Sequence, residues 1–342
     1  MHESGTMPVV IVNRVTWRGQ TMKRRIILSW MLAAGCTLVG CGGSQPAPEA
    51  DGATAPAADK PVVALIMKSL ANEFFKTMED GARAHQAEHS ADYELVAQGI
   101  KDELDVNRQV QLVEQMVARG VDAIVIAPAD SKALVAVCKR AQDKGVIIVN
   151  IDNKFDEAVL TEQGMTVPFV GPDNRAGAKV VGDYLATQLQ AGDAVAIVEG
   201  VPSAYNAIQR KLGFEDAMNG AGMTIVTSQS AGWEQAKANQ VVSAMVTSHP
   251  ELKAILCAND SMALGAVSAL RAAGKLDSIK VVGFDNISAA QSLLKEGSLV
   301  ATADQHAAEL AVFGIDFALE MLKSGASPDD QETPVDLITE AK

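Results

Sequence analysis

The sequence predicts an α/β fold in which two doubly wound parallel sheets form separate lobes. Short aliphatic runs alternate with stretches of helical apolar spacing over most of the chain after residue 60. This alternation forms two series, which meet near residue 167. The roughly 280 residues involved suit two medium-sized cores better than one large core. We therefore expect strand–helix units with right-handed crossovers in each lobe.

The first series contains four expected strands and three expected helices. Unbroken aliphatic runs are typical of parallel strands that are buried on both faces. These runs cover residues 62–67, 93–98, 123–127 and 146–151. Apolar residues spaced three or four apart predict helices over 74–89, 105–119 and 131–144. Gly120 and Gly145 predict the ends of two of these helices, because glycine favours the left-handed position that follows a helix.

The second series continues the same alternation to the end of the chain. Its expected strands cover residues 194–198, 224–228, 254–257, 280–284 and 299–303. Its expected helices cover residues 175–189, 207–219, 235–248, 262–273 and 289–295. A closing helix over 307–323 and an extended tail over 333–339 complete the expected fold.

The N-terminal segment has the pattern of a bacterial lipoprotein signal over residues 22–40. A basic start at Lys23 precedes the apolar run 26–40, which is shorter than the ~20 residues that a membrane-spanning helix needs. We expect translation to begin at Met22 and cleavage to occur before Cys41, with a lipid attached to the Cys41 sulfur. An uncleaved anchor helix is the alternative, and it also ties the chain to a membrane.

The segments that flank this signal carry no expected structure. Residues 1–21 are expected to be a mis-called start, and residues 41–60 a lipid-anchored flexible linker rich in Ala, Pro and Gly. The expected location is therefore the periplasm or cell envelope, with the protein anchored to the membrane.

The net charge argues against a nucleic-acid-binding protein, and the cysteines argue against a disulfide-linked or metal-binding one. The formal charge is −13, and it becomes −17 without residues 1–40, which hold five basic residues and one acidic residue. A protein this acidic is repelled by nucleic acid, so we expect no nucleic-acid partner. Cys138 and Cys257 lie inside apolar elements, one in each series, and are expected to be buried small hydrophobes.

No motif in the chain indicates an enzyme, a metal or a cofactor. There is no Gly-x-Ser-x-Gly elbow and no phosphate-binding loop. His85 and His89 lie four residues apart, but the intervening sequence lacks the glutamate of a zinc protease, so we expect a solvated helix face. Asp152 and Asp285 could suggest a glycosidase, but the sequence shows no surroundings that would make one carboxyl group the acid and the other the base.

Polar and aromatic side chains follow the expected strands, at the point where each strand ends. In open parallel sheets, ligands bind outside these carboxyl ends. The residues concerned are Lys68, Asn72, Phe74, Phe75, Asp152, Asn153, Arg210, Trp233, Asn259, Asp285 and Gln305. Carboxylates, amides and arginine can each bond sugar hydroxyls, and aromatic rings can cover the C–H faces of a sugar ring. The set therefore predicts a carbohydrate site.

Several segments of the chain resemble a known family, the periplasmic sugar-binding proteins of ABC transporters of the ribose/allose-binding type. The segments are ALIMKSLANEFF (64–75), IAPADS (126–131), VNIDNK (149–154), VGPDNRAGAK (170–179), IVEG (197–200), QRKLGF (209–214), CANDSMALGA (257–266), VVGFDN (281–286) and ATADQ (301–305). The resemblance implies a type I periplasmic binding protein fold with three hinge segments, near Gly171, Gln305 and Glu332. The implied lobes are 61–170 plus 306–331, and 171–305 plus 332–342.

The resemblance also assigns ligand contacts. They fall on Asn72, Phe74, Phe75, Asp152, Arg210, Trp233, Asn259, Asp285 and Gln305. Lys68 matches a lysine of the allose-binding branch, which favours a hexose-like ligand. Glu73 stands where the family usually has proline, Asn153 where it has arginine or glutamate, and Ala127 where the ribose branch has asparagine.

The function implied by this resemblance is a lipid-anchored solute-binding protein. It is expected to be a monomer that captures a neutral monosaccharide and delivers it to an ABC permease. Two alternatives share the fold. One is a sensor that presents sugar to a membrane receptor or chemotaxis protein, and the other is a sugar-responsive repressor. A repressor would carry a DNA-binding helix-turn-helix and a basic face, whereas this chain carries a signal-like segment and a large negative charge.

Overall fold

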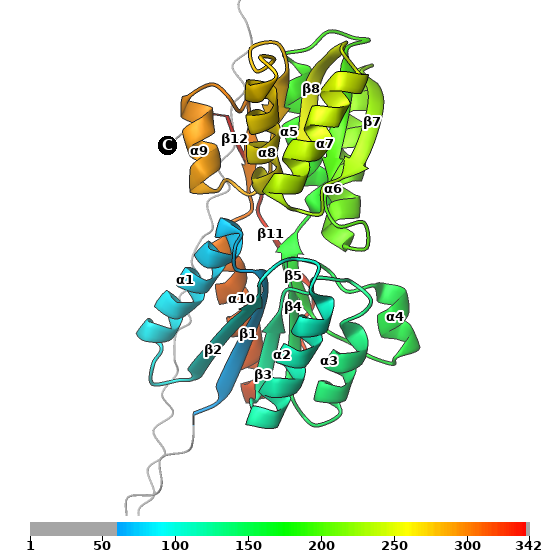
Figure 1. Cartoon of the computed structure of the whole chain (residues 1–342). Coiled ribbons are helices and arrows are strands. Elements are labelled where there is room, and N and C mark those ends of the chain that lie inside the picture. Colours follow the sequence, from blue (N-terminus) through cyan, green and yellow to red (C-terminus); the bar gives the residue numbers. More distant parts are fainter. Residues whose placement is uncertain (1–59, 340–342) are drawn as a thin grey trace, which may run out of the picture. The chain divides into compact units, whose positions relative to one another are not determined.

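Strands and helices alternate along residues 60–339, the part of the chain that the computed structural model describes (Figure 1). All of these residues belong to one structural unit. The strands are β1 Val62–Ser69, β2 Glu94–Ile100, β3 Ala123–Ile126, β4 Ile147–Ile151, β5 Phe169–Pro172, β6 Ala194–Glu199, β7 Thr224–Ser230, β8 Leu252–Cys257, β9 Lys280–Val282, β10 Thr302–Asp304, β11 Gln331–Thr333 and β12 Asp336–Ile338. The helices are α1 Glu73–Glu88, α2 Val106–Arg119, α3 Val135–Gln142, α4 Glu157–Glu162, α5 Asn174–Ala186, α6 Tyr205–Gly220, α7 Gln235–Ser248, α8 Asp260–Ala272, α9 Ser288–Lys295 and α10 Ala307–Ser324.

The strands form two main parallel sheets, each surrounded by helices. The first sheet has six strands in the order β11-β5-β4-β3-β1-β2, and the second has four in the order β7-β6-β8-β9. Strands β10 and β12 form a short antiparallel pair, and a single bridge between Val282 and Ala301 joins this pair to β9. We call the first sheet with α1–α4 and α10 the first lobe, and the second sheet with α5–α9 and the β10-β12 pair the second lobe (Figure 1). The doubly wound α/β fold class is confirmed.

The first sheet is buried on both faces, as its aliphatic strands predict. Successive side chains of a strand point to opposite faces. In β1, Val63, Leu65 and Met67 pack in one apolar cluster with α1 and α10, whereas Ala64 and Ile66 pack in another with α2 and α3. Each of these five side chains is fully buried. This two-sided packing leaves only the ends of the strands available for a ligand.

Most of the expected elements are confirmed, and α7 has the bounds that the sequence predicts. Gly120 ends α2 with φ 79°, the left-handed conformation expected of a C-terminal glycine. The expected strand 280–284 ends early, at Val282, and the next residue, Gly283, lies against the Asp260 carboxylate. A Cβ atom at Gly283 would stand 2.0 Å from Asp260 Oδ1.

Other elements also differ from the expectation. The helix expected over 131–144 begins only at Val135, because residues 131–134 form turns. The short elements α4, β5 and β11 have six, four and three residues, too few to show a period in the sequence.

The chain passes between the two lobes three times. It leaves the first sheet after β5, returns between β10 and α10, and leaves again between β11 and β12. Gly171 and Glu332, expected near two of these crossings, are register partners in β5 and β11. Gln305, expected near the third, lies between β10 and α10. The three crossings thus come together beside the edge of the first sheet.

Other sequence expectations have mixed outcomes. Cys138 and Cys257 are both buried and free, as expected, and burial raises the pKa of the Cys138 thiol to about 12. The expectation of a solvated face is wrong for His85, whose side chain is only 11% exposed and whose Nδ1 lies 3.0 Å from the Tyr93 hydroxyl. His89 stacks on His85, with 4.2 Å between the ring centroids.

Two kinds of feature are absent from the described residues. No helix within residues 60–339 is long and apolar enough to cross a membrane. The same residues contain no group of three or more His, Cys, Asp or Glu side chains placed to hold a metal ion. The signal segment, the lipidation site at Cys41 and the linker lie outside the described residues.

Candidate functional site

Side chains from both lobes line one buried cavity at the carboxyl ends of the strands. The space between its lining atoms, including open solvent at its edge, is about 220 Å³. The lining residues are Lys68, Asn72, Phe74, Phe75, Glu103, Asp152, Asn206, Arg210, Trp233, Asn259, Asp285 and Gln305. The structure thus brings together ten of the eleven residues that the sequence places at the ligand. Asn153 is the exception.

Local backbone geometry aims these side chains at the cavity. Asn72 is the N-cap of α1 and accepts a hydrogen bond from the Phe74 amide, and Asn259 caps α8 in the same way through Met262. Asp152, Trp233 and Asp285 have φ angles of 61°, 71° and 124°, values that side-chain-bearing residues rarely adopt. Such backbone conformations persist only when the surrounding structure holds them, and they gather at functional sites.

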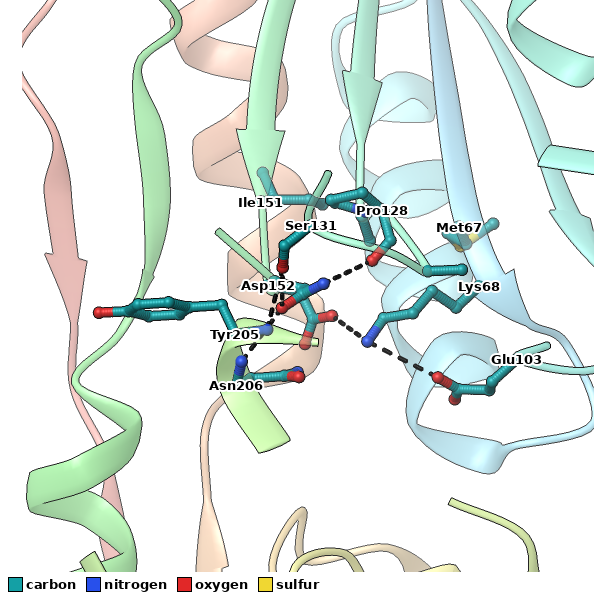
Figure 2. A network of polar contacts seen from close by, with 12 residues as sticks. Met67, Lys68, Glu103, Pro128, Ser131, Ile151, Asp152, Tyr205 and Asn206 are labelled. Atoms are coloured by element: carbon teal, nitrogen blue, oxygen red, sulfur yellow. Dashed lines mark hydrogen bonds and ion pairs between the residues drawn. The ribbon is translucent and has the colours of Figure 1, made fainter. Parts of the chain in front are cut away.

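The first-lobe side of the cavity is an ion-pair network centred on Lys68 (Figure 2). Lys68 Nζ lies 3.0 Å from Asp152 Oδ2 and 3.6 Å from Glu103 Oε2. Burial lowers the pKa of Lys68, but the two carboxylates outweigh it and hold that pKa above its ordinary value. Burial also raises the pKa of Glu103 to about 7, although Lys68 opposes this shift. Lys68 is therefore a charged, fixed hydrogen-bond donor.

The second-lobe side of the cavity is built around the Arg210 guanidinium. Its Nε donates to Asn174 Oδ1 (2.8 Å), its Nη1 to the Ala258 carbonyl (2.9 Å) and to Asp285 Oδ1 (3.4 Å), and its Nη2 to Gln305 Oε1 (3.2 Å). A guanidinium has five N–H donors, so within residues 60–339 one Nη2–H remains for a ligand.

Asp285 shares this network with Arg210. Gln305 Nε2 donates to Asp285 Oδ1 at 2.7 Å. Burial raises the pKa of Asp285 well above its ordinary value, while Arg210 opposes the shift. One oxygen of this carboxylate is thus held by Arg210 and Gln305, which fixes the direction of the other.

Aromatic rings cover the remaining walls of the cavity. Phe74 and Phe75 meet edge to face, with centroids 5.1 Å apart. Trp233 faces both cations, with Lys68 Nζ at 5.8 Å and Arg210 Cζ at 5.6 Å from its ring centroid. Gly200 lies directly behind this indole, because a Cβ there would stand 2.1 Å from a ring carbon. The position of the ring depends on that missing side chain.

Beside the cavity, first-lobe side chains cap helices of the second lobe, and Figure 2 shows Ser131 next to Tyr205 at the start of α6. The residue before α6 is Ala204, which has no side-chain oxygen to cap the helix. Instead, Ser131 Oγ accepts from the Tyr205 amide at 2.9 Å, and Asn153 Oδ1 accepts from the Asn206 amide at 3.1 Å.

Helix α9 is capped in the same manner. Its N-cap is Ile287, and Glu73 Oε1 of the first lobe accepts from the Ser288 amide at 2.9 Å. We call these three hydrogen bonds, made by Ser131, Asn153 and Glu73, the inter-lobe caps. Glu73 also occupies the first turn of α1, where a carboxylate is favourable.

Asn153 therefore has a different environment from the other expected site residues. Its Nδ2 donates to the Pro128 carbonyl at 2.8 Å, and its Oδ1 is taken by the Asn206 amide. Both ends of the side-chain amide are used by protein, and Asn153 does not line the cavity.

Glu103 and Asn206 line the cavity, but the sequence did not single them out. Glu103 follows β2, at the same sheet edge as Lys68, so inspecting the end of that strand would have found it. Asn206 precedes Arg210 by four residues, which places both on one face of α6.

Comparison with models of protein families identifies the family of this chain. A family model described as "Periplasmic binding protein domain" matches residues 63–327. The chain belongs to this family. The family and fold expected from the sequence motifs are thus confirmed.

Individual members of the family are similar over most of their length. The D-ribose/D-allose-binding protein of Pseudomonas aeruginosa is 55% identical over 323 residues, which cover 93% of this chain and 99% of that protein. A solute-binding protein structure from Burkholderia multivorans is 57% identical with a TM-score of 0.81, covering 82% of this chain and 100% of the other. A solute-binding protein from Actinobacillus succinogenes with bound D-allose is 33% identical with a TM-score of 0.78, covering 82% and 98%.

Proposed function

We propose that this periplasmic binding protein captures a neutral monosaccharide of the ribose or allose type between its two lobes and delivers it to an ABC permease. The observation that carries the proposal is the cavity, in which charged, amide and aromatic side chains of both lobes converge. The carboxylate, amide and cationic groups of the lining can bond the hydroxyls of a sugar, and the aromatic rings can cover its C–H faces. The named ligands of the relatives support the same class.

The charges of the cavity favour a neutral ligand. Two cations, Lys68 and Arg210, face three carboxyl groups, and both cations are paired with carboxylates already. A sugar acid would bring a further negative charge to a site with no unpaired cation among the described residues. Hydroxyl groups, which donate and accept, match both the carboxylates and the remaining N–H donors.

Capture is proposed to occur by closure of the lobes about the three crossings. A switch from 99:1 open to 99:1 closed needs about 5.5 kcal/mol of preference for the closed form. The inter-lobe caps form whenever the lobes close, with or without the sugar, so their contribution is already part of the open–closed equilibrium of the sugar-free protein. The sugar must therefore supply the whole difference, and two or three hydrogen bonds to charged groups that form only on closure, at about 1.5–3 kcal/mol each, would do so.

The location is proposed from the N-terminal pattern and the family. The lipoprotein-like segment supports attachment to the membrane through Cys41, with residues 41–60 as a tether. Binding without turnover is proposed, since the site residues hold each other in place and none is positioned as an activated nucleophile.

Isothermal titration of the full chain with D-allose and D-ribose tests this function. We expect a dissociation constant in the micromolar range or below for at least one of them, and recovery of the sugar unchanged. Small-angle scattering should show a smaller radius of gyration with the bound sugar. The absence of binding to any aldose, ketose or polyol in a thermal-shift screen would refute the proposal.

A further inference from the structure

Asn206 has a buried side chain that the rest of the described protein does not use. It is the second residue of α6, it is 2% exposed, and it lines the cavity. Its Oδ1 is buried without a hydrogen-bond partner. Native proteins pair nearly all of their buried polar atoms, so an unpaired amide at a cavity indicates a partner that comes from outside.

The backbone of the same residue is fully occupied. The Asn206 amide donates to Asn153 Oδ1 of the first lobe at 3.1 Å, and this bond helps to fix the N-terminal turn of α6 (Figure 2). One turn further along the helix, Arg210 is held by four hydrogen bonds of its own network. The Asn206 side chain is therefore positioned rigidly between the inter-lobe caps and the Arg210 network.

A second unpaired atom lies in the same cavity wall. Trp233 Nε1 is buried and has no hydrogen-bond partner within residues 60–339. The cavity thus presents an unused amide and an unused N–H donor in addition to its ion pairs. An apolar ligand could not satisfy either group, whereas a hydroxyl can accept from one and donate to the other.

We propose that the Asn206 side-chain amide bonds a ligand hydroxyl and so determines which polyhydroxylated ligand this protein selects. This inference rests on the proposed function, because it assigns a role in the same cavity. A site built to hydrogen-bond a hydroxyl discriminates strongly against an analogue without it, since the protein group is then left buried and unpaired. Selectivity among similar sugars should therefore depend on Asn206 as well as on the ion-paired residues.

The test is titration of Asn206→Ala with D-allose, D-ribose and the monodeoxy derivatives of D-allose. The substitution keeps the backbone amide that bonds Asn153, so it removes only the side-chain contact. We expect at least tenfold weaker binding of the better parent sugar. One deoxy derivative should bind Asn206→Ala and the unaltered protein with similar affinity, because the hydroxyl that it lacks is the partner of Asn206.

The control variant is Ile208→Ala, which changes an exposed side chain of the same helix and should bind as the unaltered protein does. Binding of both parent sugars by Asn206→Ala within twofold of the unaltered protein would overturn the role of Asn206 and leave the proposed function standing. If the unaltered protein bound neither parent sugar nor any polyol, the proposed function would fail first.

Discussion

Ser131→Ala provides the most direct test of the inter-lobe caps. The substitution removes the oxygen that accepts from the Tyr205 amide at 2.9 Å, and leaves the main chain of Ser131 in place. Replacing an N-cap serine by alanine costs about 1 kcal/mol, within a range of ~0.5–2 kcal/mol. If this bond exists only in the closed form, the whole cost falls on sugar binding. The dissociation constant should then rise about fivefold, because about 1.4 kcal/mol corresponds to tenfold.

The assay combines isothermal titration with thermal melting of the sugar-free protein. The melting temperature of sugar-free Ser131→Ala should stay within about one degree of the unaltered protein. The matched control is Ser243→Ala, which removes a hydroxyl that bonds only the Asn239 carbonyl within α7 and should leave sugar affinity unchanged. An unchanged dissociation constant in Ser131→Ala would refute the closure argument. A fall in the melting temperature of the sugar-free protein would also refute it, since the cap would then stabilise both forms.

Three further predictions concern the cavity itself. Burial raises the pKa of Glu103 to about 7 in this structure, and if lobe closure causes that burial, closure favours the protonated form. Sugar affinity should then be highest below the ordinary carboxyl pKa and fall as the pH rises to about 7. In a titration series from pH 4 to 8, Glu103→Gln should make this fall smaller, and Asp285, whose pKa is also raised by burial, accounts for the remainder. Gly200→Ala should displace the Trp233 ring and weaken sugar binding at least tenfold. Tryptophan fluorescence that does not change with the substitution would contradict the close contact between Gly200 and the Trp233 ring. Arg210→Ala should abolish sugar binding. It should also lower the melting temperature of the sugar-free protein, because it leaves the Asp285 carboxylate without its cation. An unchanged melting temperature would show that the Arg210 network does not stabilise the second lobe.

Much of the fold and most of the candidate site follow from local patterns in the sequence. Aliphatic runs mark the central strands because both faces of the sheets are buried, and the carboxyl ends of parallel strands meet at one edge. The residues after β1, β4, β8 and β9 therefore reach the same cavity. Short elements such as β11 escape prediction because three residues show no period, and they are fixed by pairing with a distant strand.

The roles of particular side chains depend on contacts that the sequence does not reveal. Local rules look for the N-cap of α6 at position 204, where alanine stands, but the cap comes from Ser131, which lies 74 residues before Tyr205. Asn153 follows a ligand-facing aspartate, so its sequence position predicts a ligand contact, yet its amide is taken by two backbone groups. Such assignments require the two lobes to be placed against each other.

The carboxylate of Glu73 has a consequence for how this chain could diverge from others of its type. A proline at the same position, the residue that the family resemblance leads one to expect there, would have no side-chain oxygen to accept from the Ser288 amide. Evolution could therefore adjust how readily an empty protein shuts by changing a rim residue that never meets the sugar. Affinity and the resting open fraction would then shift together through such rim positions, while chemical selectivity, which depends on the cavity residues, stayed the same.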